Sequence, residues 1–150
     1  MMKMQWHSKN FNELTNHELY SILKARTDVF VVEQNCAYPE LDNYDQESIH
    51  YYGTIKNEIA AYVRLLPKGL KYEDAAAIGR VLVSKKFRSH GIAREIMERS
   101  IDFIVDEWKE NNIKIQAQDY LKDFYRSLGF IQISDVYLED GIPHIDMQFK

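Results

Sequence analysis

Hydrophobic residues recur along the chain with two different periods, and the two periods predict alternating helices and strands. Between residues 92 and 108 the apolar side chains return every three or four positions, which is typical of one face of a long amphipathic helix. We expect this helix to lie on a sheet and to end at Asn111-Asn112. Its predicted buried stripe is Ile92, Ile96, Met97, Ser100, Ile101, Ile104 and Trp108.

A shorter helix is predicted near the N-terminus, after a strand near Met4–His7. Thr15 and Glu18 have the spacing of a capping box, in which each side chain satisfies a free backbone N–H of the first helical turn. The helix is expected to extend to about Val31. From residue 33 to 48 the periodicity disappears, which indicates an exposed loop.

Three runs rich in Tyr, Val, Ile and Ala follow, and they read as antiparallel strands. Residues 50–55 and 58–66 flank a Lys56-Asn57 turn, and a third run covers residues 75–83. A short strand at 113–117 follows the long helix. A strand, helix and strand crossover makes the pair 75–83 and 113–117 parallel, so the sheet is expected to be mixed.

The last third of the chain predicts a short helix and two closing strands. Gly129 is expected to stop the helix, and Asp140-Gly141 to form the turn between the strands. The predicted ranges are 121–128 for the helix and 130–137 and 145–149 for the strands.

Length and composition predict one domain over residues 1–150. A chain of 150 residues with 45% hydrophobic and 28% charged residues can bury one sizeable core but not two. No apolar run approaches the roughly 20 residues that span a bilayer, and the first nine residues lack signal-peptide features. We therefore expect a cytoplasmic protein with no membrane partner. A single cysteine, Cys36, excludes an internal disulfide and a multi-thiolate metal site, and no metal is expected.

The formal net charge of -4 argues against a nucleic-acid partner, because no broad positive surface is available to follow a phosphate backbone. A local basic patch is still present at Lys85, Lys86 and Arg88, where the strand ending in Val81-Leu82-Val83 turns into the long helix. The first N–H groups of a helix have no intrahelical partners and carry a partial positive charge, so they favour an anion.

Residues at this helix start have the properties of an anion site. Gly91 lets an anion approach the backbone, Arg88 supplies a planar fork of donors, and Ala93 keeps the entrance open. Neither a P-loop nor a dinucleotide-binding fingerprint is present. An ordinary solvated basic turn remains the alternative at this point. The candidate contacts are Arg88, Ser89, His90, Gly91, Ile92, Ala93 and Arg94.

A second segment, Phe124-Tyr125-Arg126-Ser127-Leu128-Gly129-Phe130, lies one helix and one strand downstream. Together the two segments resemble the GNAT superfamily of acetyltransferases. Its [QR]-x-x-G-x-[GA] consensus, which binds the pyrophosphate of coenzyme A, matches Arg88, Gly91 and Ala93. Its Y-x-x-x-G-F segment matches Tyr125, Gly129 and Phe130, and Gln118 stands where the family often has an asparagine.

Segments near both ends resemble the small bacterial ElaA-like branch of that superfamily. They are residues 29–36, with Tyr38 and Asp42 beyond, and residues 139–144. The resemblance covers the whole order of strands and helices. It implies an α/β (α+β) GNAT fold: one mixed, mostly antiparallel sheet, a central parallel pair splayed to admit coenzyme A, and helices on both faces. It also implies acetyl-CoA as co-substrate and direct transfer to an amine in a ternary complex.

Site roles follow from the resemblance and from the needs of acetyl transfer. Unpaired N–H groups of Val81, Leu82 and Val83 would hold the pantetheine and stabilise the oxyanion. The Gln118 amide would bond the pantetheine arm. Tyr125 is the candidate general acid, because a phenol stays protonated at neutral pH. The base stays open among Glu33, His50, His144 and a water chain, and no sequence feature favours Cys36 as a nucleophile.

The sequence says least about the acceptor substrate. Residues 32–49 contain five acidic residues and no Lys or Arg, and Glu139, Asp140 and Asp146 follow near the C-terminus. If both regions flank the acceptor, their field would attract a cationic amine such as a polyamine, an aminoglycoside-like amine, a lysine side chain or an N-terminal amine. A merely solubilising acidic loop is the alternative. A non-catalytic acyl-CoA sensor, a longer acyl group and a homodimer also stay open.

Overall fold

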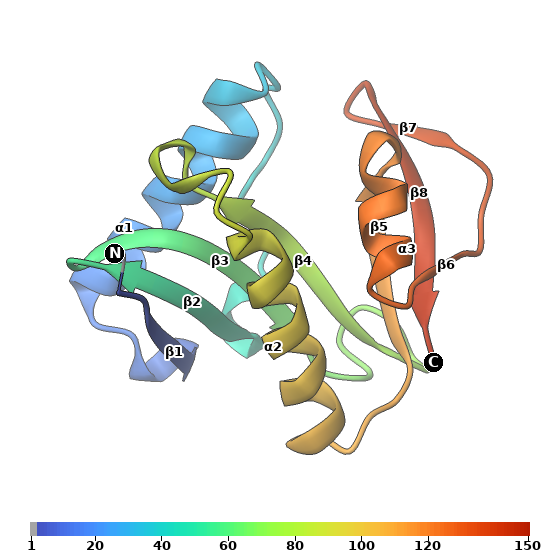
Figure 1. The fold of residues 1–150 in the computed structure, drawn as a ribbon, viewed down its shortest axis with the longest axis horizontal. Coiled ribbons are helices and arrows are strands. Elements are labelled where there is room, and N and C mark those ends of the chain that lie inside the picture. Colours follow the sequence, from blue (N-terminus) through green and yellow to red (C-terminus); the bar gives the residue numbers. More distant parts are fainter. Residues whose placement is uncertain (1–2) are drawn as a thin grey trace.

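The computed structural model describes residues 3–150, which form one mixed sheet with helices on both faces (Figure 1). The helices are α1 (Asn16–Arg26), α2 (Ile92–Asp106) and α3 (Lys122–Ser127). The strands are β1 (Gln5–Asn10), β2 (Ile49–Ile55), β3 (Glu58–Leu66), β4 (Ala76–Val83), β5 (Ile113–Gln118), β6 (Ile131–Gln132), β7 (Tyr137–Glu139) and β8 (Ile142–Phe149).

The strand order confirms the predicted mixed sheet. It runs β1-β2-β3-β4-β5-β8-β6, with β7 also paired to β8. Only β4 and β5 are parallel, and all the other neighbours in the described sheet are antiparallel. Parallel neighbours need a crossover connection, and α2 supplies it between β4 and β5.

Two apolar clusters hold the layers together. The larger one joins α2 and α3 to one face of the sheet, and Ile96, Met97 and Ile104 of α2 are fully buried in it. The smaller one joins α1 to the opposite face through Ile22 and Tyr62. Burial of a stripe that repeats every three to four residues explains why the hydrophobic pattern located α2.

Helix α1 begins as the sequence predicts. The Thr15 hydroxyl accepts from the Glu18 N–H at 3.1 Å, and the Glu18 carboxylate accepts from the Thr15 N–H at 2.8 Å, which completes the capping box. A π-helical turn over Thr27–Glu33 then continues the helix beyond the predicted end at Val31.

Helix α2 ends earlier than predicted, at Asp106. Lys109 adopts a left-handed conformation with φ 55°, which no helix interior accommodates. Trp108 packs its ring against Phe103 at a centroid distance of 5.6 Å. Trp108 therefore continues the apolar stripe by folding back on the helix rather than by extending it.

The predicted strand over residues 130–137 was wrong in its middle. Only Ile131–Gln132 and Tyr137–Glu139 pair with β8. Between them the Ser134 hydroxyl accepts the Asp146 N–H at 2.8 Å, so a side chain replaces a backbone partner. Strand β8 is longer than predicted, because the Asp140-Gly141 turn pairs Glu139 with Ile142.

The parallel pair at the centre of the sheet comes apart along its length. Strands β4 and β5 pair only at Ala76 with Ile113 and at Ala77 with Lys114, and they diverge from there toward the end where β7 lies (Figure 1). Arg80 has φ 51° at a register shift between β3 and β4, so β4 carries a bulge. The splayed pair expected of the fold is therefore present, with the bulge on its β4 side.

Candidate active site

A cleft of about 960 Å³ opens where β4 and β5 separate. The edge of β4 forms one side, β5 and α3 form the other, and the start of α2 lies at one end. The segment after α1 and the β7–β8 hairpin form the remaining walls. These two walls meet where the Cys36 thiol lies 3.5 Å from the Asp140 carbonyl oxygen.

The start of α2 faces the cleft with free backbone donors. Gly91 is the N-cap residue with φ 73°, a left-handed conformation that favours glycine, and a Cβ built there would contact nothing within 4 Å. The N–H groups of Ile92, Ala93 and Arg94 lie in the first turn, before the Glu95 N–H makes the first intrahelical bond to Gly91. An open backbone with unused donors fits a phosphate group.

Arg88 is already engaged in an ion pair. Its Nε donates to the Val83 carbonyl oxygen at 2.9 Å, and its two Nη groups donate to the Glu33 carboxylate, one of them at 3.0 Å. The guanidinium lowers the pKa of Glu33, chiefly through this hydrogen bond. Two residues predicted for different tasks, anion binding and proton removal, therefore bind one another.

Arg94 joins the two sides of the cleft at the same end. Its Nη2 donates to the Ser127 hydroxyl of α3 at 2.6 Å, and its guanidinium lies over the Phe124 ring. A second guanidinium is thus held beside the free N–H groups of α2, where it adds positive charge for an anion.

Strand β4 presents an edge without a strand partner on the side of β5. Past Ala77 it pairs only with β3, and Val81, Leu82 and Val83 line the cleft. The Val83 carbonyl oxygen already accepts from Arg88, and the other outward N–H and C=O groups of this edge are available to an extended ligand, as at any open sheet edge. Gln118, on the opposite side, also lines the cleft.

Tyr125 lies on α3 with its residue 7% exposed, and it lines the cleft. Its ring packs edge-on against Phe124 and Phe130, and its hydroxyl makes no hydrogen bond to the described part of the chain. Burial raises the pKa of Tyr125 to about 12, because the phenolate would lose its hydration. The hydroxyl therefore stays protonated at neutral pH.

The candidate base His50 was a wrong prediction, because His50 is fully buried and does not line the cleft. Its Nε2 lies 2.9 Å from the Asp45 carbonyl oxygen, which can only accept, so Nε2 carries the proton. Its Nδ1 then accepts from the Tyr62 hydroxyl at 2.7 Å. Burial lowers the pKa of His50, and neither nitrogen is free for a substrate proton.

His144 is placed differently, on β8 at the wall of the cleft. Its Nδ1 donates to the Ile142 carbonyl oxygen at 2.7 Å, which leaves Nε2 unprotonated and able to accept. A Glu139 carboxylate oxygen lies 3.9 Å from Nε2. His144 is also the cross-strand partner of Gln118.

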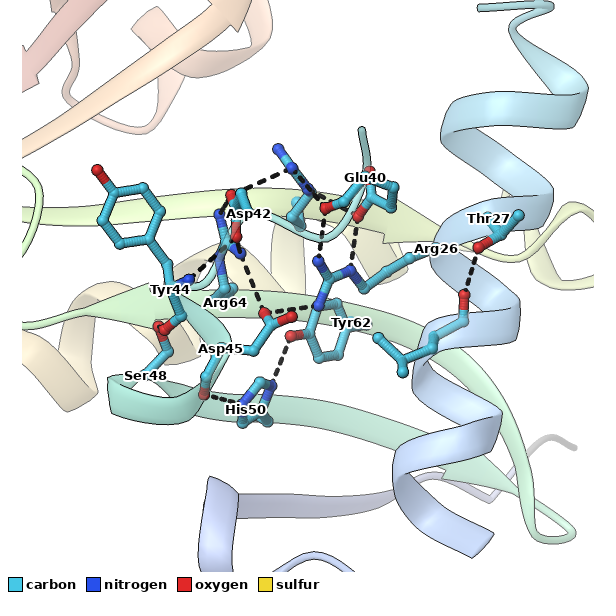
Figure 2. Close-up of polar contacts among 12 residues, drawn as sticks. Arg26, Thr27, Glu40, Asp42, Tyr44, Asp45, Ser48, His50, Tyr62 and Arg64 are labelled. Atoms are coloured by element: carbon cyan, nitrogen blue, oxygen red, sulfur yellow. Dashed lines mark hydrogen bonds and ion pairs between the residues drawn. The ribbon is translucent and has the colours of Figure 1, made fainter. Parts of the chain in front are cut away.

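Three arginines and three carboxylates form a cluster beside the cleft. Figure 2 labels Arg26, Arg64 and the three carboxylates. Arg26 of α1 binds Glu40 and Asp45, each at 2.7 Å, and its side chain is 0% exposed. Arg64 of β3 binds Asp42 and Asp45. Arg80, at the bulge of β4, binds Glu40 at 2.7 Å and Asp42 at 3.2 Å.

This ion cluster overturns the expectation of a simply exposed loop between residues 33 and 48. Glu40, Asp45 and Ser48 are buried, and the Tyr38 hydroxyl also donates to Glu40. Three of the five acidic residues in the predicted stretch are matched by arginines from α1, β3 and β4, and Glu33 is matched by Arg88. The part of the predicted acidic field that came from Glu33, Glu40, Asp42 and Asp45 is therefore cancelled.

The arginines of this cluster were not predicted from the sequence. Arg64 and Arg80 are each the only charged residue in an apolar run, over residues 59–66 and 76–83. A single charged residue in such a run predicts a buried partner, and the acidic stretch without Lys or Arg is the complementary signal. The pairing anchors the bulged residue of β4 to the loop that walls the cleft.

Most of the predicted site residues come together in this cleft. His90 and His50 are the exceptions, since neither lines it. The predicted residues that line it are Glu33, Val81, Leu82, Val83, Arg88, Ser89, Gly91, Ile92, Ala93, Arg94, Gln118, Tyr125 and His144. Residues 3–150 contain no group of three or more His, Cys, Asp or Glu side chains that could hold a metal ion. None of the helices in that range has both the length and the apolar content to cross a membrane.

Comparisons with known proteins agree with this geometry. Residues 16–150 match the model of the acetyltransferase (GNAT) domain. Protein ElaA of Escherichia coli is 37% identical over 146 residues, which cover 96% of this chain and 95% of ElaA. The crystal structure of an acyl-CoA N-acyltransferase from Pseudomonas aeruginosa superposes with a TM-score of 0.94 at 37% identity, over 99% of this chain and 100% of that one. The crystal structure of E. coli ElaA superposes with a TM-score of 0.92, over 99% of this chain and 100% of ElaA.

Proposed function

The chain belongs to the GNAT acetyltransferase family and is an acyltransferase that uses acyl-CoA, and from this premise we propose that it moves an acetyl group from acetyl-CoA to a primary amine by direct attack in a ternary complex. The observation that carries the proposal is the meeting, in one cleft, of three unrelated features. They are the free N–H groups at the start of α2, the unpaired edge of β4 and the protonated Tyr125 hydroxyl.

The chemical groups along the cleft fit the successive parts of coenzyme A. The N–H groups of Ile92, Ala93 and Arg94 would bind the pyrophosphate, with the Arg94 guanidinium beside them. The edge of Val81–Val83 would hold the pantetheine arm as a substitute strand, and the Gln118 amide would bond it from the other side. When bound, the cofactor supplies the activated acyl group as a thioester.

Tyr125 is proposed as the general acid. Its hydroxyl is protonated at neutral pH and has no competing hydrogen bond in residues 3–150. It would give its proton to the sulfur as the carbon–sulfur bond breaks. Direct transfer requires no covalent enzyme intermediate. Within residues 3–150 the Cys36 thiol hydrogen-bonds to the Asp140 carbonyl oxygen and to no basic side chain that could take its proton.

His144 is proposed as the base. An alkyl amine arrives protonated and must lose a proton before it attacks the acyl carbon. His144 lines the cleft, its tautomer is fixed by the Ile142 carbonyl oxygen, and its Nε2 can therefore accept a proton from the amine. Glu33 is a poorer base, because Arg88 holds its pKa low.

Acetyl is proposed as the acyl group, and a primary amine as the acceptor. A positively charged acceptor was predicted from the acidic stretch, and the pairing of those acids with arginines weakens the physical basis for that prediction. Polyamines, an aminoglycoside and a lysine peptide therefore belong in an acceptor panel beside neutral and anionic amines.

Two measurements test the proposal. Calorimetry with acetyl-CoA and with a longer acyl-CoA measures cofactor binding, and release of free thiol in the presence of each amine measures transfer. We expect binding and amine-dependent thiol release with acetyl-CoA. Binding without turnover on any amine would favour the alternative of a non-catalytic acyl-CoA sensor, and faster turnover with the longer acyl-CoA would reject acetyl as the transferred group.

A further inference from the structure

The part of the cleft on the face of the sheet away from α2 is lined by a separate group of polar and charged side chains. Side chains alternate along β5, and Ile113, Ile115 and Ala117 enter the core with α2. Lys114 and Gln116 therefore belong to the opposite face, and both line the cleft.

An ammonium group without a carboxylate partner lies on this face. Lys71, in the connection from β3 to β4, lines the cleft, and its Nζ donates to the Gln116 side-chain oxygen at 2.7 Å. Gln116 is a neutral amide. Lys71 forms no ion pair with any residue in the described range 3–150, so its charge is not balanced by contact.

Tyr72 gathers two ammonium groups at this position. The Nζ atoms of Lys71 and Lys114 lie 5.8 and 5.3 Å from the centre of its ring. Lys114 is matched by Asp74 at 3.2 Å. Of the two ammonium groups beside this ring, Lys71 is thus the one that is free to bind an anion in the cleft.

The surroundings of Lys71 also favour an incoming anion. Lys71 is an exposed residue, yet partial desolvation of its ammonium lowers its pKa; Glu139 raises the pKa, while Arg64 and Arg80 lower it further and Asp42 raises it. The Nε–H of Arg64, which also lines the cleft, is buried and has no hydrogen-bond partner within residues 3–150. Within the described residues, this end therefore contains one ammonium without an ion-pair partner and one buried N–H without a hydrogen-bond partner.

A carboxylate faces the cleft from another wall. Glu139 of β7 lines the cleft and lies beyond ion-pair distance from Lys71. The His144 Nε2 lies 3.9 Å from its Oε2. Lys71 and Glu139 thus present opposite charges to the cleft from different elements without forming an ion pair, which is an arrangement that complements a small zwitterion.

We propose that the acceptor is an amine that also carries a carboxylate, such as an amino acid, and that Lys71 binds this carboxylate. The inference rests on the proposed function and names the substrate class of the same cleft. The amine end would lie toward Glu139 and His144. There the ammonium gives one proton to His144, and the neutral amine nitrogen bonds to the acyl carbon as the carbon–sulfur bond breaks. The sulfur leaves with the proton of Tyr125, and the second proton that the nitrogen releases returns to Tyr125.

Matched acceptors test the inference by turnover. Glycine, β-alanine and γ-aminobutyrate carry a carboxylate at increasing distance from the amine, and glycinamide and propylamine carry none. With acetyl-CoA, we expect at least one carboxylate-bearing amine to exceed both carboxylate-free amines about 10- to 100-fold in kcat/KM, as one charged hydrogen bond allows. Equal values across the panel would overturn the inference.

Variants assign the effect to Lys71. Lys71→Gln should abolish the preference by raising KM for the carboxylate-bearing acceptor, with the affinity for acetyl-CoA unchanged, and Lys71→Arg should restore much of it. Lys68→Gln is the matched control, since Lys68 lies in the same connection, is 57% exposed in its side chain and does not line the cleft. An unchanged preference in Lys71→Gln would remove Lys71 from acceptor binding.

A binding arm separates this inference from the proposed function. N-acetylglycine and its neutral analogue N-methylacetamide are titrated into the protein and followed by NMR, which requires no turnover. Tighter binding of N-acetylglycine, lost in Lys71→Gln and kept in Lys68→Gln, would support the carboxylate site even if no amine were acetylated. Equal binding of the two probes would overturn it, while acetylation of simple amines would still support the proposed function.

Discussion

Arg88 and Glu33 form a two-pronged ion pair in which each Nη group of the guanidinium donates to one carboxylate oxygen. The pair connects the turn before α2 with the end of the π-helical turn that follows α1, across 55 positions of sequence. In this arrangement the Glu33 carboxylate binds the Arg88 guanidinium, which the sequence motif predicts to bind a phosphate. If Arg88 binds the cofactor as the motif predicts, cofactor binding and this ion pair would compete for its guanidinium.

Glu33→Gln should increase the affinity for coenzyme A about two- to fivefold. The substitution removes a competing carboxylate and one negative charge beside the anion site, and an exposed pair of this kind contributes about 0.2–1 kcal/mol. Calorimetric titration with coenzyme A measures the effect. Glu58→Gln, which removes a similarly exposed partner of Lys86, is the control and should leave the affinity unchanged. Weaker binding in Glu33→Gln would mean that Glu33 orients Arg88 for the ligand.

Tyr125→Phe should lower kcat by about 10- to 10⁴-fold and leave coenzyme A affinity nearly intact. The phenol is the protonated donor of the cleft, and its removal leaves the departing thiolate without an acid. Steady-state kinetics with acetyl-CoA and the best amine give the comparison, with single-turnover measurements to establish that chemistry limits the rate. Tyr120→Phe is the matched control, because Tyr120 lines the same cleft but is 75% exposed. An unaltered kcat would exclude Tyr125 as the acid.

His144→Gln should lower kcat about 10²- to 10⁴-fold and remove the acidic limb of the pH–rate profile. Glutamine can still donate to the Ile142 carbonyl, so the hairpin is retained, but it cannot take up a proton. His50→Gln provides the contrast. It should reduce stability while keeping the shape of the pH–rate profile, because both nitrogens of His50 are already bonded inside the protein. A profile that changes only in His50→Gln would reverse the assignment.

Asp45→Asn should destabilise the protein by about 3–5 kcal/mol, the usual cost of removing one partner from a buried ion pair. Asp45 accepts from both Arg26 and Arg64, and Arg26 has no access to water. Urea unfolding followed by circular dichroism measures the loss. Asp28→Asn is the control, because the Asp28 side chain is 55% exposed and its pair with Lys24 should contribute less than about 0.5 kcal/mol. Equal losses in the two variants would show that the cluster contributes no more than a surface pair.

The stability of the protein should fall as the solution is made acidic, in two stages. Burial lowers the folded-state pKa of His50 below 6.5, so the unfolded chain binds the proton first and stability declines as the pH falls below about 6.5. The arginines lower the pKa of Asp42 from 3.8 to about 2 against the opposing effect of burial, and they lower that of Asp45 as well. Their stabilising contribution is complete above about pH 4 and is lost toward pH 2.

Urea unfolding at pH 8, 6, 5, 4 and 3 checks both stages. Asp42→Asn should flatten the lower stage, and His50→Gln should flatten the upper one. A free energy of unfolding that stays constant from pH 8 to 5 in the wild-type protein would contradict the buried neutral state of His50.

The local sequence pattern predicted where the helices and strands of this fold lie, but it predicted their ends less accurately. The stripe from Ile92 to Ile104 and the capping box at Thr15 and Glu18 depend on neighbours within one or two helical turns, so the sequence displays them directly. The tail of α2 and the interrupted strand after Phe130 depend on Trp108 folding back and on Ser134 replacing a backbone partner. Neither contact produces a repeating pattern in the sequence from which it could be predicted.

Most of the strands and helices, the glycine at the start of α2 and the position of Tyr125 could be predicted from the sequence, because each depends on a short segment and its immediate neighbours. Which charges are free could be seen only in the folded chain. Arg26 meets Glu40 across 14 positions, and Arg80 meets Glu40 across 40. Charge pairing depends on distance in space, and so the loop that looks acidic in sequence is neutralised in the fold, while Lys71 is left without a partner.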